Sequence, residues 1–190
     1  IVTLLSIIIP VYNSEKNIPI LQKKIMQSIK LKHEIIFIND ESKDSSWEII
    51  KKISNNKNIY GINLFKNVGQ DNAIMAGLSL AKGDYIIIMD DDLQHDPSSI
   101  LDLYTKCKQG YDVVYANFTE KKQKIWKNFG SWINGKFALL FIKKPSSLYI
   151  SPFKIIHKKI IAQMLSFKSP FIYVDGIILS LTNNIAQIET

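Results

Sequence analysis

Five short apolar runs recur along the first 117 residues, and helix-type segments separate them. The runs are LLSIIIPVY, which ends at Tyr12, then EIIFIN (34–39), NIYGINLF (58–65), DYIIIM (84–89) and YDVVYAN (111–117). Continuous apolar runs of this length are typical of strands buried on both faces of a parallel sheet. Strands that alternate with helices imply helical layers on both sides of that sheet. The sequence therefore predicts an α/β fold with a mostly parallel central sheet.

The segments between the runs carry helix-start signals. Asn13 or Ser14 is the expected cap of a helix that runs to about Lys30. Ser45 and Glu48 form a Ser-x-x-Glu capping pattern, which predicts a helix over about 46–54. Two further helices are expected, from about Gly69 to Ala81 and from about Pro97 to Gln109.

Length, charge and cysteine content limit the class of protein. A chain of 190 residues suits one domain with a substantial core, and 46% apolar with 22% charged residues is ordinary for such a domain. All 24 basic residues are lysines, and the net charge of +7 favours anionic partners such as nucleotides or membrane surfaces. A single cysteine, Cys107, excludes an internal disulfide and suits a reducing compartment. No stretch reaches the roughly 18 apolar residues of a membrane-spanning helix, so we expect any anchor to lie outside this chain.

An acidic cluster, MDDDLQHD (89–96), directly follows the fourth apolar run. Adjacent carboxylates repel one another, and each costs free energy when desolvated unless it is paired or binds a cation. Asp90 and Asp92 form an Asp-x-Asp pair, with Gln94 two positions further on. Mg²⁺ or Mn²⁺ takes oxygen ligands of this kind and keeps positions open for substrate phosphates. The cluster therefore predicts a metal and diphosphate site held by Asp90, Asp92 and Gln94.

Polar residues also follow the other apolar runs. In open parallel sheets, ligands bind beyond the carboxyl ends of the strands, so these residues are expected to meet at one edge. Asp40 could accept a hydrogen bond from a nucleobase or cap the next helix, and Lys66 could meet phosphate or remain solvated. Gly69 and Gly77 suit a helix entry and a close contact. No Gly-x-Gly-x-x-Gly pattern is present, which argues against a dinucleotide-binding fold. The residues expected at this edge are Tyr12, Asn13, Asp40, Glu41, Lys66, Asn67 and the cluster at 90–92.

The pattern changes after Phe118. KKQKIWKNFGSWINGKFALLFIKK (121–144) combines lysines and aromatic residues, with apolar positions at helical spacing. Two interpretations stay open: an amphipathic helix packed on the sheet, or an interfacial helix that rests on lipid headgroups.

Several segments together resemble the family-two nucleotide-sugar glycosyltransferases, and most of all the dolichyl-phosphate mannose synthase and polyprenyl-phosphate glycosyltransferase branch. The resemblance covers nearly the whole chain. The segments that carry it are PVYN (10–13), INDESKD (38–44), KNVGQDNAIMAGLSLAKGDYIIIMDDDLQHDP (66–97), GYDVVYAN (110–117), SPFKIIHKKII (151–161) and PFIYVDGIILSLTNNIAQIE (170–189).

The resemblance implies a GT-A fold, a nucleoside diphosphate sugar donor and a divalent metal. It places Pro10, Tyr12 and Asp40 near the base and ribose, and Asp90, Asp92 and Gln94 at the metal and diphosphate. Asn13, Lys66, Asn67 and Asp91 complete the expected donor-binding set. The chain departs from the family pattern at Asn39 and Glu41, which flank Asp40, and at Lys66 and Lys154, where arginine is usual. Lysine lacks the bidentate fork of arginine, so looser phosphate geometry is expected.

The acceptor decides whether a general base is needed. A sugar hydroxyl needs one, and Asp175 in YVDGII is then the candidate; with Asp92 it forms the expected catalytic set. A lipid monophosphate has a second pKa of about 6 and needs no base. Asp175 would then have a structural role, such as capping a helix over 176–183.

These observations predict a metal-dependent inverting glycosyltransferase that uses a uridine or guanosine diphosphate sugar. The expected acceptor is a polyprenyl phosphate, undecaprenyl or dolichyl, at the cytoplasmic face of the cell membrane. Lysines between 121 and 136 are expected to meet phosphates. The expected organisation is one domain over 1–190, cut from a longer chain, with a donor-binding half (1–117) and an acceptor and membrane-proximal half (118–190). The alternatives are a soluble transferase to a polysaccharide hydroxyl and a non-catalytic nucleotide-sugar or membrane-binding module. A nucleic-acid partner is not expected, because the predicted edge is acidic at its centre.

Overall fold

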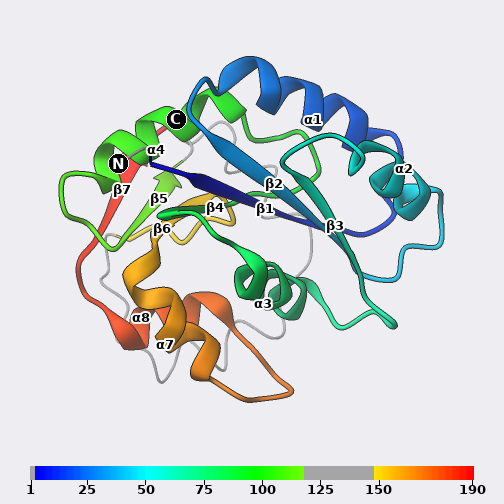
Figure 1. Cartoon of the computed structure of the whole chain (residues 1–190). Coiled ribbons are helices and arrows are strands. Elements are labelled where there is room, and N and C mark those ends of the chain that lie inside the picture. The colour runs from blue at the N-terminus through cyan, green and yellow to red at the C-terminus, as the bar shows by residue number, and fades with distance from the viewer. Residues whose placement is uncertain (1–2, 118–147) are drawn as a thin grey trace.

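The strands form one sheet in a computed structural model that describes residues 3–117 and 148–190 (Figure 1). Within these ranges the sheet has seven strands in the order β3-β2-β1-β4-β6-β5-β7. Every pairing is parallel except those of β6, which runs antiparallel to β4 and to β5. The predicted mostly parallel sheet is confirmed. The strands are β1 (Leu5–Val11), β2 (His33–Asn39), β3 (Ile59–Asn63), β4 (Tyr85–Ile88), β5 (Val113–Asn117), β6 (Lys154–His157) and β7 (Ile185–Glu189).

Helices cover both faces of the sheet. In Figure 1, α1 (Asn17–Ser28), α2 (Ser46–Ile53) and α4 (Ile100–Cys107) lie above it. Below it lie α3 (Gln70–Leu80), α7 (Ile161–Ser166) and α8 (Val174–Leu181). Short 3-10 turns, η1 (Pro97–Ser99) and η2 (Lys158–Ile160), precede α4 and α7. In the two described ranges, no helix combines the length and apolar character needed to cross a bilayer.

The continuous apolar strands have a direct packing reason. Successive residues of a strand point to opposite faces, and here both faces are covered. Ile7 packs with α1 and α4 on one side, whereas Ile8 packs with α3 and α8 on the other. All seven residues of β1 are therefore buried, and each isoleucine contributes about 1.5–3 kcal/mol of hydrophobic stabilisation.

Two strands were not predicted from the sequence. β6 has only four residues and includes a buried lysine, Lys154, and β7 is a half-buried edge strand. They flank β5, where Val113 pairs with Ile156 on one side and with Ile185 on the other. Neither segment has the long apolar run that identified the first five strands, because tertiary pairing rather than local pattern sets them.

The predicted side-chain caps of α1 and α2 were wrong, although Ser45 does hold the cap position of α2. α1 begins at Asn17, and Asn13 has a positive φ of 55°. The Asn13 N–H donates to Ser42 Oγ at 2.9 Å, and Asn13 Oδ1 accepts from the Lys43 N–H at 2.7 Å. Ser45 precedes α2 but makes no side-chain cap hydrogen bond. The Ser46 backbone N–H donates instead to Asp44 Oδ1, at 3.0 Å. The sequence patterns located both helices. The Ser14 backbone carbonyl accepts from the first N–H groups of α1, whereas the Glu15 and Asp44 side chains accept from the N–H groups at the start of α2.

A buried polar group joins β1, β2 and the entry to β4 near the amino-terminal ends of these strands. The Ser6 hydroxyl donates to Glu34 Oε1 at 2.6 Å and accepts from the Gly83 N–H at 2.8 Å. The Lys82 N–H donates to the same Glu34 oxygen at 2.7 Å. A Cβ atom at Gly83 would lie 2.6 Å from Ser6 N and 2.9 Å from Leu4 O. Only glycine lets the chain enter β4 at this distance from β1.

Replacing Gly83 with alanine is therefore expected to destabilise the fold by about 2 kcal/mol, because the clash is with backbone atoms that cannot rotate away. Urea unfolding followed by circular dichroism measures the change. The neighbouring exposed variant Lys82→Ala is the control, and it should stay within about 0.5 kcal/mol of the original chain. Equal stability of the two variants would contradict the close approach.

Candidate functional site

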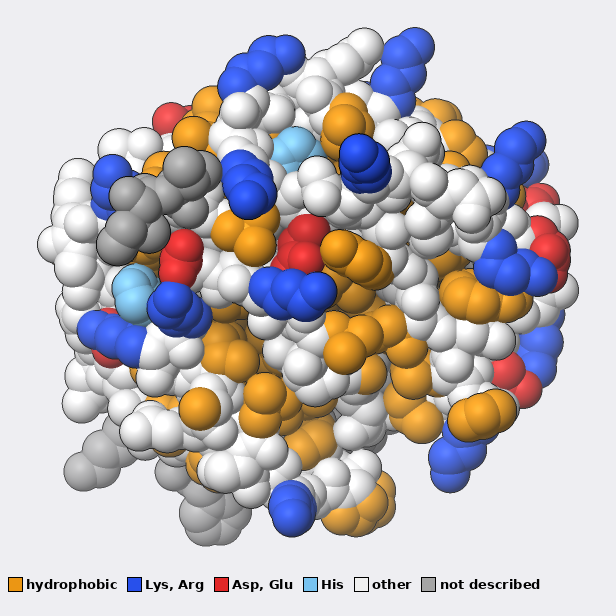
Figure 2. Space-filling model, in the orientation of Figure 1, with side chains coloured by type: hydrophobic (Ala, Val, Ile, Leu, Met, Phe, Trp, Pro, Cys, Tyr) orange, Lys and Arg blue, Asp and Glu red, His pale blue; other side chains and the backbone are white. Residues whose placement is uncertain are grey.

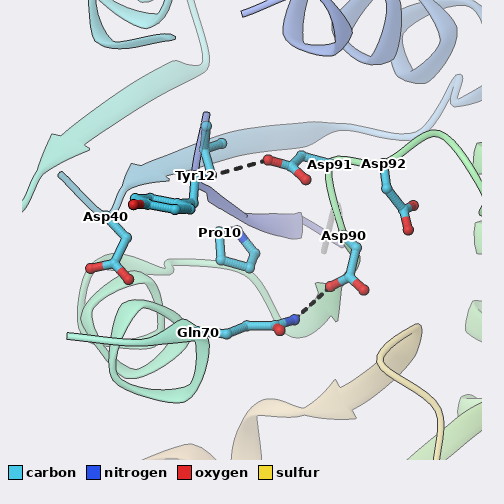
Figure 3. Close-up of a pocket in the computed structure, with 8 residues that line it drawn as sticks. Pro10, Tyr12, Asp40, Gln70, Asp90, Asp91 and Asp92 are labelled. Atoms are coloured by element: carbon cyan, nitrogen blue, oxygen red, sulfur yellow. Dashed lines mark hydrogen bonds between the residues drawn. The ribbon is translucent and has the colours of Figure 1, made fainter. Parts of the chain in front are cut away.

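The carboxyl ends of β1, β2 and β4 meet at one edge of the sheet because these strands are parallel neighbours. A pocket of about 200 Å³ opens there (Figure 3). Pockets that enclose a drug-sized ligand are roughly 300–1,000 Å³, so the described residues would enclose a ligand as large as a nucleotide sugar only in part. The lining residues are Pro10, Val11, Tyr12, Asp40, Gln70, Asp90, Asp91 and Asp92.

The three consecutive aspartates of the pocket point in two directions. Asp91 faces β1, where its Oδ2 accepts from the Tyr12 N–H at 3.4 Å. Asp90 and Asp92 point away from Tyr12, toward the opposite side of the pocket in Figure 3. Asp90 Oδ1 accepts from Gln70 Nε2 at 2.6 Å, and Asp92 Oδ1 accepts from the Gln94 N–H at 3.0 Å. All three aspartates therefore line the pocket, with Asp91 bonded to β1 and Asp90 and Asp92 turned to the other side.

An aromatic contact supports the acidic loop from behind. His95 is buried, and its ring stacks on Phe153 with 5.1 Å between centroids and 24° between planes. Its Nε2 lies 3.9 Å from Asp90 Oδ2. The loop is therefore anchored at Tyr12, at Gln70 and at this buried ring.

Burial raises the free energy of the ionised forms of Asp91 and Asp92. It raises the pKa of Asp91 to about 6, although hydrogen bonds with Ser14 and the Tyr12 N–H oppose the increase. Burial is also the largest cause of the raised pKa of Asp92. The hydrogen bond from the Gln94 N–H lowers that pKa, and the charge of Asp90 raises it. A cation between the carboxylates would remove this cost, because it favours their ionised forms.

The side chains present fit a divalent metal that substrate helps to hold. Within residues 3–117 and 148–190, no three or more His, Cys, Asp or Glu side chains are grouped to hold a metal ion by themselves. Mg²⁺ is usually bound through one or two carboxylates together with substrate phosphates. Asp90 and Asp92, which face the pocket together, match that incomplete oxygen donor set.

Asp40 lies in the pocket wall but is already engaged. Its side chain is buried, with Oδ1 accepting from the Val68 N–H at 2.8 Å and Oδ2 from the Gly69 N–H at 2.9 Å. It therefore anchors the entry to α3. The alternative interpretation, in which Asp40 caps the next helix, α2, was wrong. A carboxylate has about four acceptor positions, so these two bonds leave capacity for a ligand.

Four other residues that were predicted to bind the sugar donor or its metal do not line the pocket. The Asn13 side chain accepts from the Lys43 N–H, and the Asn67 side chain donates to Asp40 O, so both hold neighbouring loops together. Lys66 and Gln94 are exposed residues outside the wall. Pro10, Tyr12, Asp40 and the three aspartates are brought together as expected.

Sequence reasoning missed Gln70 and Val11. Val11 lines the pocket at the last position of β1, whereas Gln70 is the first residue of α3. A signal for Gln70 existed in the sequence, because Gly69 suits a helix entry soon after the third apolar run. In the structure Gly69, with a φ of 86°, is the residue directly before α3. The first side chain of the helix that follows lies at the pocket and reaches Asp90.

A second polar group lies below the sheet. Asp175 Oδ1 accepts from Tyr115 Oη at 2.8 Å and from Lys154 Nζ at 2.5 Å. Lys154 and Tyr115 are buried in neighbouring strands, and the lysine nitrogen lies 5.2 Å from the tyrosine ring centre. Lys154 pairs in register with Ile88, two residues before Asp90, so the group lies next to the acidic loop.

Asp71 of α3 faces the same group. Burial is the main cause of its raised pKa, with the charge of Asp175 adding to the increase. Lys154 and a hydrogen bond from the Val174 N–H lower it. Burial also raises the pKa of Tyr173 to about 12 and holds that of Tyr115 well above its ordinary value. Two carboxylates thus share one buried ammonium group.

This arrangement corrects two expectations. Lys154 was expected to give looser phosphate geometry in place of arginine, but its side chain is only 3% exposed and forms an ion pair with Asp175. The helix expected over 176–183 begins at Val174, so Asp175 lies inside its first turn and does not cap it from outside. The predicted lysine-rich and aromatic helix at 121–144, including the lysines at 121–136, lies outside the described residues.

The architecture is shared with solved sugar-transferring enzymes. Glucosyl-3-phosphoglycerate synthase from Mycobacterium tuberculosis, crystallised with Mn²⁺, UDP and phosphoglyceric acid, superposes with a TM-score of 0.67 at 16% identity. The match covers 98% of this chain and 68% of that one. An α/β sheet of this order with an acidic pocket at its strand ends defines the class as the GT-A fold, which confirms the expected fold.

The family follows from the sequence. Residues 6–165 match the model of glycosyl transferase family 2, so the chain belongs to that family and is a glycosyltransferase. It is 33% identical to the uncharacterized glycosyltransferase sll0501 of Synechocystis over 166 residues, which cover 83% of this chain and 51% of that protein. It is 38% identical to undecaprenyl-phosphate 4-deoxy-4-formamido-L-arabinose transferase of Aeromonas hydrophila over 130 residues, 66% of this chain and 40% of the relative. The chain thus spans about half or less of the length of these curated relatives.

Proposed function

We propose that this chain is the donor-binding part of an enzyme that transfers a sugar from a uridine or guanosine diphosphate sugar to a polyprenyl phosphate. The observation that carries the proposal is the pocket at the strand ends, where Asp90 and Asp92 face the same side beside Pro10 and Tyr12. The Aeromonas relative, whose name states an undecaprenyl-phosphate acceptor, supports the acceptor class.

We assign Asp90 and Asp92 as ligands of Mg²⁺ or Mn²⁺, with Gln94 assisting. A bound divalent ion would neutralise the acids and stabilise the negative charge that develops on the departing diphosphate. The Mn²⁺ and UDP in the structural neighbour are consistent with this assignment. Asp91, turned toward Tyr12, would hold the loop in shape rather than meet the ion.

The nucleoside is expected against β1 and β2. Pro10 and Tyr12 form one wall, and the half-exposed Tyr12 ring is available for contact with the base or ribose. Asp40, which keeps acceptor capacity, is the proposed hydrogen-bond partner of a base N–H. Lys66 and Asn67 lie one strand further out, and a phosphate contact from either of them stays a prediction.

A phosphate acceptor is compatible with an Asp175 whose carboxylate is already hydrogen-bonded. A lipid monophosphate is largely dianionic at neutral pH, so its oxygen can attack the anomeric carbon without a general base. The nucleoside diphosphate leaves from the opposite side, and the configuration inverts. Asp175 already accepts two hydrogen bonds, which supports a positioning role over proton removal. The proposed site of transfer is the cytoplasmic face of the membrane.

Thermal denaturation with nucleoside diphosphates tests the donor site. A ligand that binds the native state raises the melting temperature by mass action. UDP or GDP with Mn²⁺ is expected to raise it, and either component alone is expected to raise it less. A transfer assay with undecaprenyl phosphate and with a soluble oligosaccharide then tests the acceptor. Product on the oligosaccharide alone would replace the lipid acceptor with a sugar hydroxyl.

Gln70 is expected to set the affinity for the metal through Asp90. Groups that orient metal ligands typically contribute 10- to 100-fold in affinity, so Gln70→Ala should weaken Mn²⁺ binding in the presence of UDP by roughly 10-fold or more. Titration of Mn²⁺ followed by electron paramagnetic resonance measures this directly. Gln27→Ala, an exposed glutamine of α1, is the matched control. If Gln70→Ala binds Mn²⁺ with unchanged affinity, Gln70 does not orient Asp90 for the metal.

A further inference from the structure

The segment between α7 and α8 exposes aromatic side chains that the fold does not use. Phe171 is 90% exposed and Phe167 is 42% exposed, although Met164 before them and Val174 after them are buried. The segment is therefore a projecting apolar tip on an anchored base. Water-exposed aromatic surface of this kind is costly unless a partner covers it.

The surface around this tip is also apolar. Figure 2 shows hydrophobic side chains gathered on the lower half of the visible face, where Figure 1 places α3, α7 and the turn after α7. These elements carry the exposed Leu80 and the partly exposed Met75 and Leu165. The tip therefore continues into a wider apolar region.

The charged side chain within the tip is a lysine. Lys168 is exposed between the two phenylalanines. In the described residues before α8, from 148 to 173, the sequence has four lysines and no aspartate or glutamate. Three of the lysines, at 154, 158 and 159, form ion pairs with aspartates from elsewhere in the fold. Aromatic residues with lysines and without acids are the composition that suits an anionic lipid surface.

The tip also leads directly into the second polar group. Tyr173 and Asp175 follow Phe171 within four residues, and Asp175 contacts Lys154 beside the acidic loop. A bilayer in contact with the tip would therefore lie at the edge of the molecule from which a lipid phosphate must arrive. This step rests on the proposed function, because only a lipid acceptor requires such an approach.

We propose that the 167–173 segment is a membrane-docking tip. Phe167 and Phe171 insert into the interfacial region of an anionic bilayer, and Lys168 contacts its headgroups. The partner is the lipid surface itself rather than a second protein.

Co-sedimentation of the 190-residue chain with vesicles tests this docking. The chain should bind vesicles of phosphatidylcholine and phosphatidylglycerol in equal parts, and bind pure phosphatidylcholine much less. The double variant Phe167→Ser/Phe171→Ser should lower the partition coefficient by about tenfold or more, because two aromatic side chains no longer insert. Added salt should weaken binding of the original chain, since it screens the attraction of lysine to the headgroups.

A matched control comes from the opposite side of the molecule. Ile20→Ser/Met26→Ser alters two α1 residues that are 46% and 47% exposed, and α1 lies at the top of Figure 1 whereas the tip lies at the bottom. This variant should bind vesicles as the original chain does. Equal binding by both double variants, or no binding by the original chain, would overturn the proposal.

Two further readouts separate the possible failures. The melting-temperature increase with UDP and Mn²⁺ should be the same in the Phe167→Ser/Phe171→Ser variant, because neither residue lines the pocket. Loss of vesicle binding with an unchanged increase supports the docking tip. If UDP and Mn²⁺ raise the melting temperature of neither chain, the proposed donor site is wrong. The vesicle result then tests the docking tip by itself. Light scattering that shows a dimer in the original chain and a monomer in the variant, with equal vesicle binding, would assign the tip to self-association.

Discussion

Replacing Asp92 with asparagine is expected to lower Mn²⁺-dependent turnover by about 10²- to 10³-fold. Asparagine preserves the size of the side chain and one oxygen, but it removes the charge that would hold the ion against the diphosphate. Metal stabilisation of the leaving group contributes several kcal/mol, and each 1.36 kcal/mol is a factor of ten in rate. Transfer to undecaprenyl phosphate, followed at increasing Mn²⁺ concentrations, measures the loss.

The comparison variant for this experiment is Asp102→Asn. Asp102 is an exposed aspartate of α4, on the other side of the sheet from α3, and its change should leave turnover unaltered. Melting temperatures of both variants check that the fold is intact. If Asp92→Asn reaches the original rate at saturating Mn²⁺, Asp92 is not a required metal ligand.

Replacing Lys154 with methionine is expected to destabilise the fold by about 3 kcal/mol or more. The side chains of Lys154 and Asp175 are only 3% and 15% exposed, and removal of one member of a buried ion pair typically costs about 3–5 kcal/mol. Asp71 makes the loss larger, because it would then face Asp175 without the shared ammonium group. Denaturant unfolding at neutral pH measures the change in the free energy of unfolding.

A double variant distinguishes the ion pair from simple packing. Lys154→Met combined with Asp175→Asn removes both charges, so it should be more stable than Lys154→Met alone. Lys159→Met removes a lysine whose side chain is 50% exposed and pairs with Asp112, and it should cost less than about 1 kcal/mol. Additive effects of the changes at 154 and 175 would show that the two side chains do not stabilise each other.

The sequence carried enough information for the donor side of the fold. The apolar runs are readable because β1, β2 and β4 are buried on both faces, and a parallel order follows from the helices between them. Parallel neighbours bring their carboxyl ends together, so the amino-acid sequence alone could place Pro10, Tyr12, Asp40 and the aspartates in one pocket. The rule places backbone ends, not side chains, which is why Lys66 and Asn67 were also expected there and do not line the wall.

The remainder depends on partners that are distant in the sequence. Asp40 was read as a ligand contact or a local cap, but its oxygens bind backbone N–H groups 28 and 29 residues away. Lys154 looked like a phosphate contact, but a strand pairing places it beside Asp175 of another element. β6 has no pattern of its own to reveal it. Local periodicity carries no information about such long-range pairings.

The reversed strand, β6, has a consequence for how proteins of this design can diversify. β5 ends and β6 begins at the edge that carries the pocket, because the two strands are antiparallel. A connection between them leaves and returns at the same edge, whereas a parallel strand would require a crossover past the sheet. Residues can therefore be inserted or deleted after Asn117 without a shift in the register of β1, β2 or β4. Chimeric enzymes made by exchange of that connection between relatives should therefore keep the strand register of β1, β2 and β4.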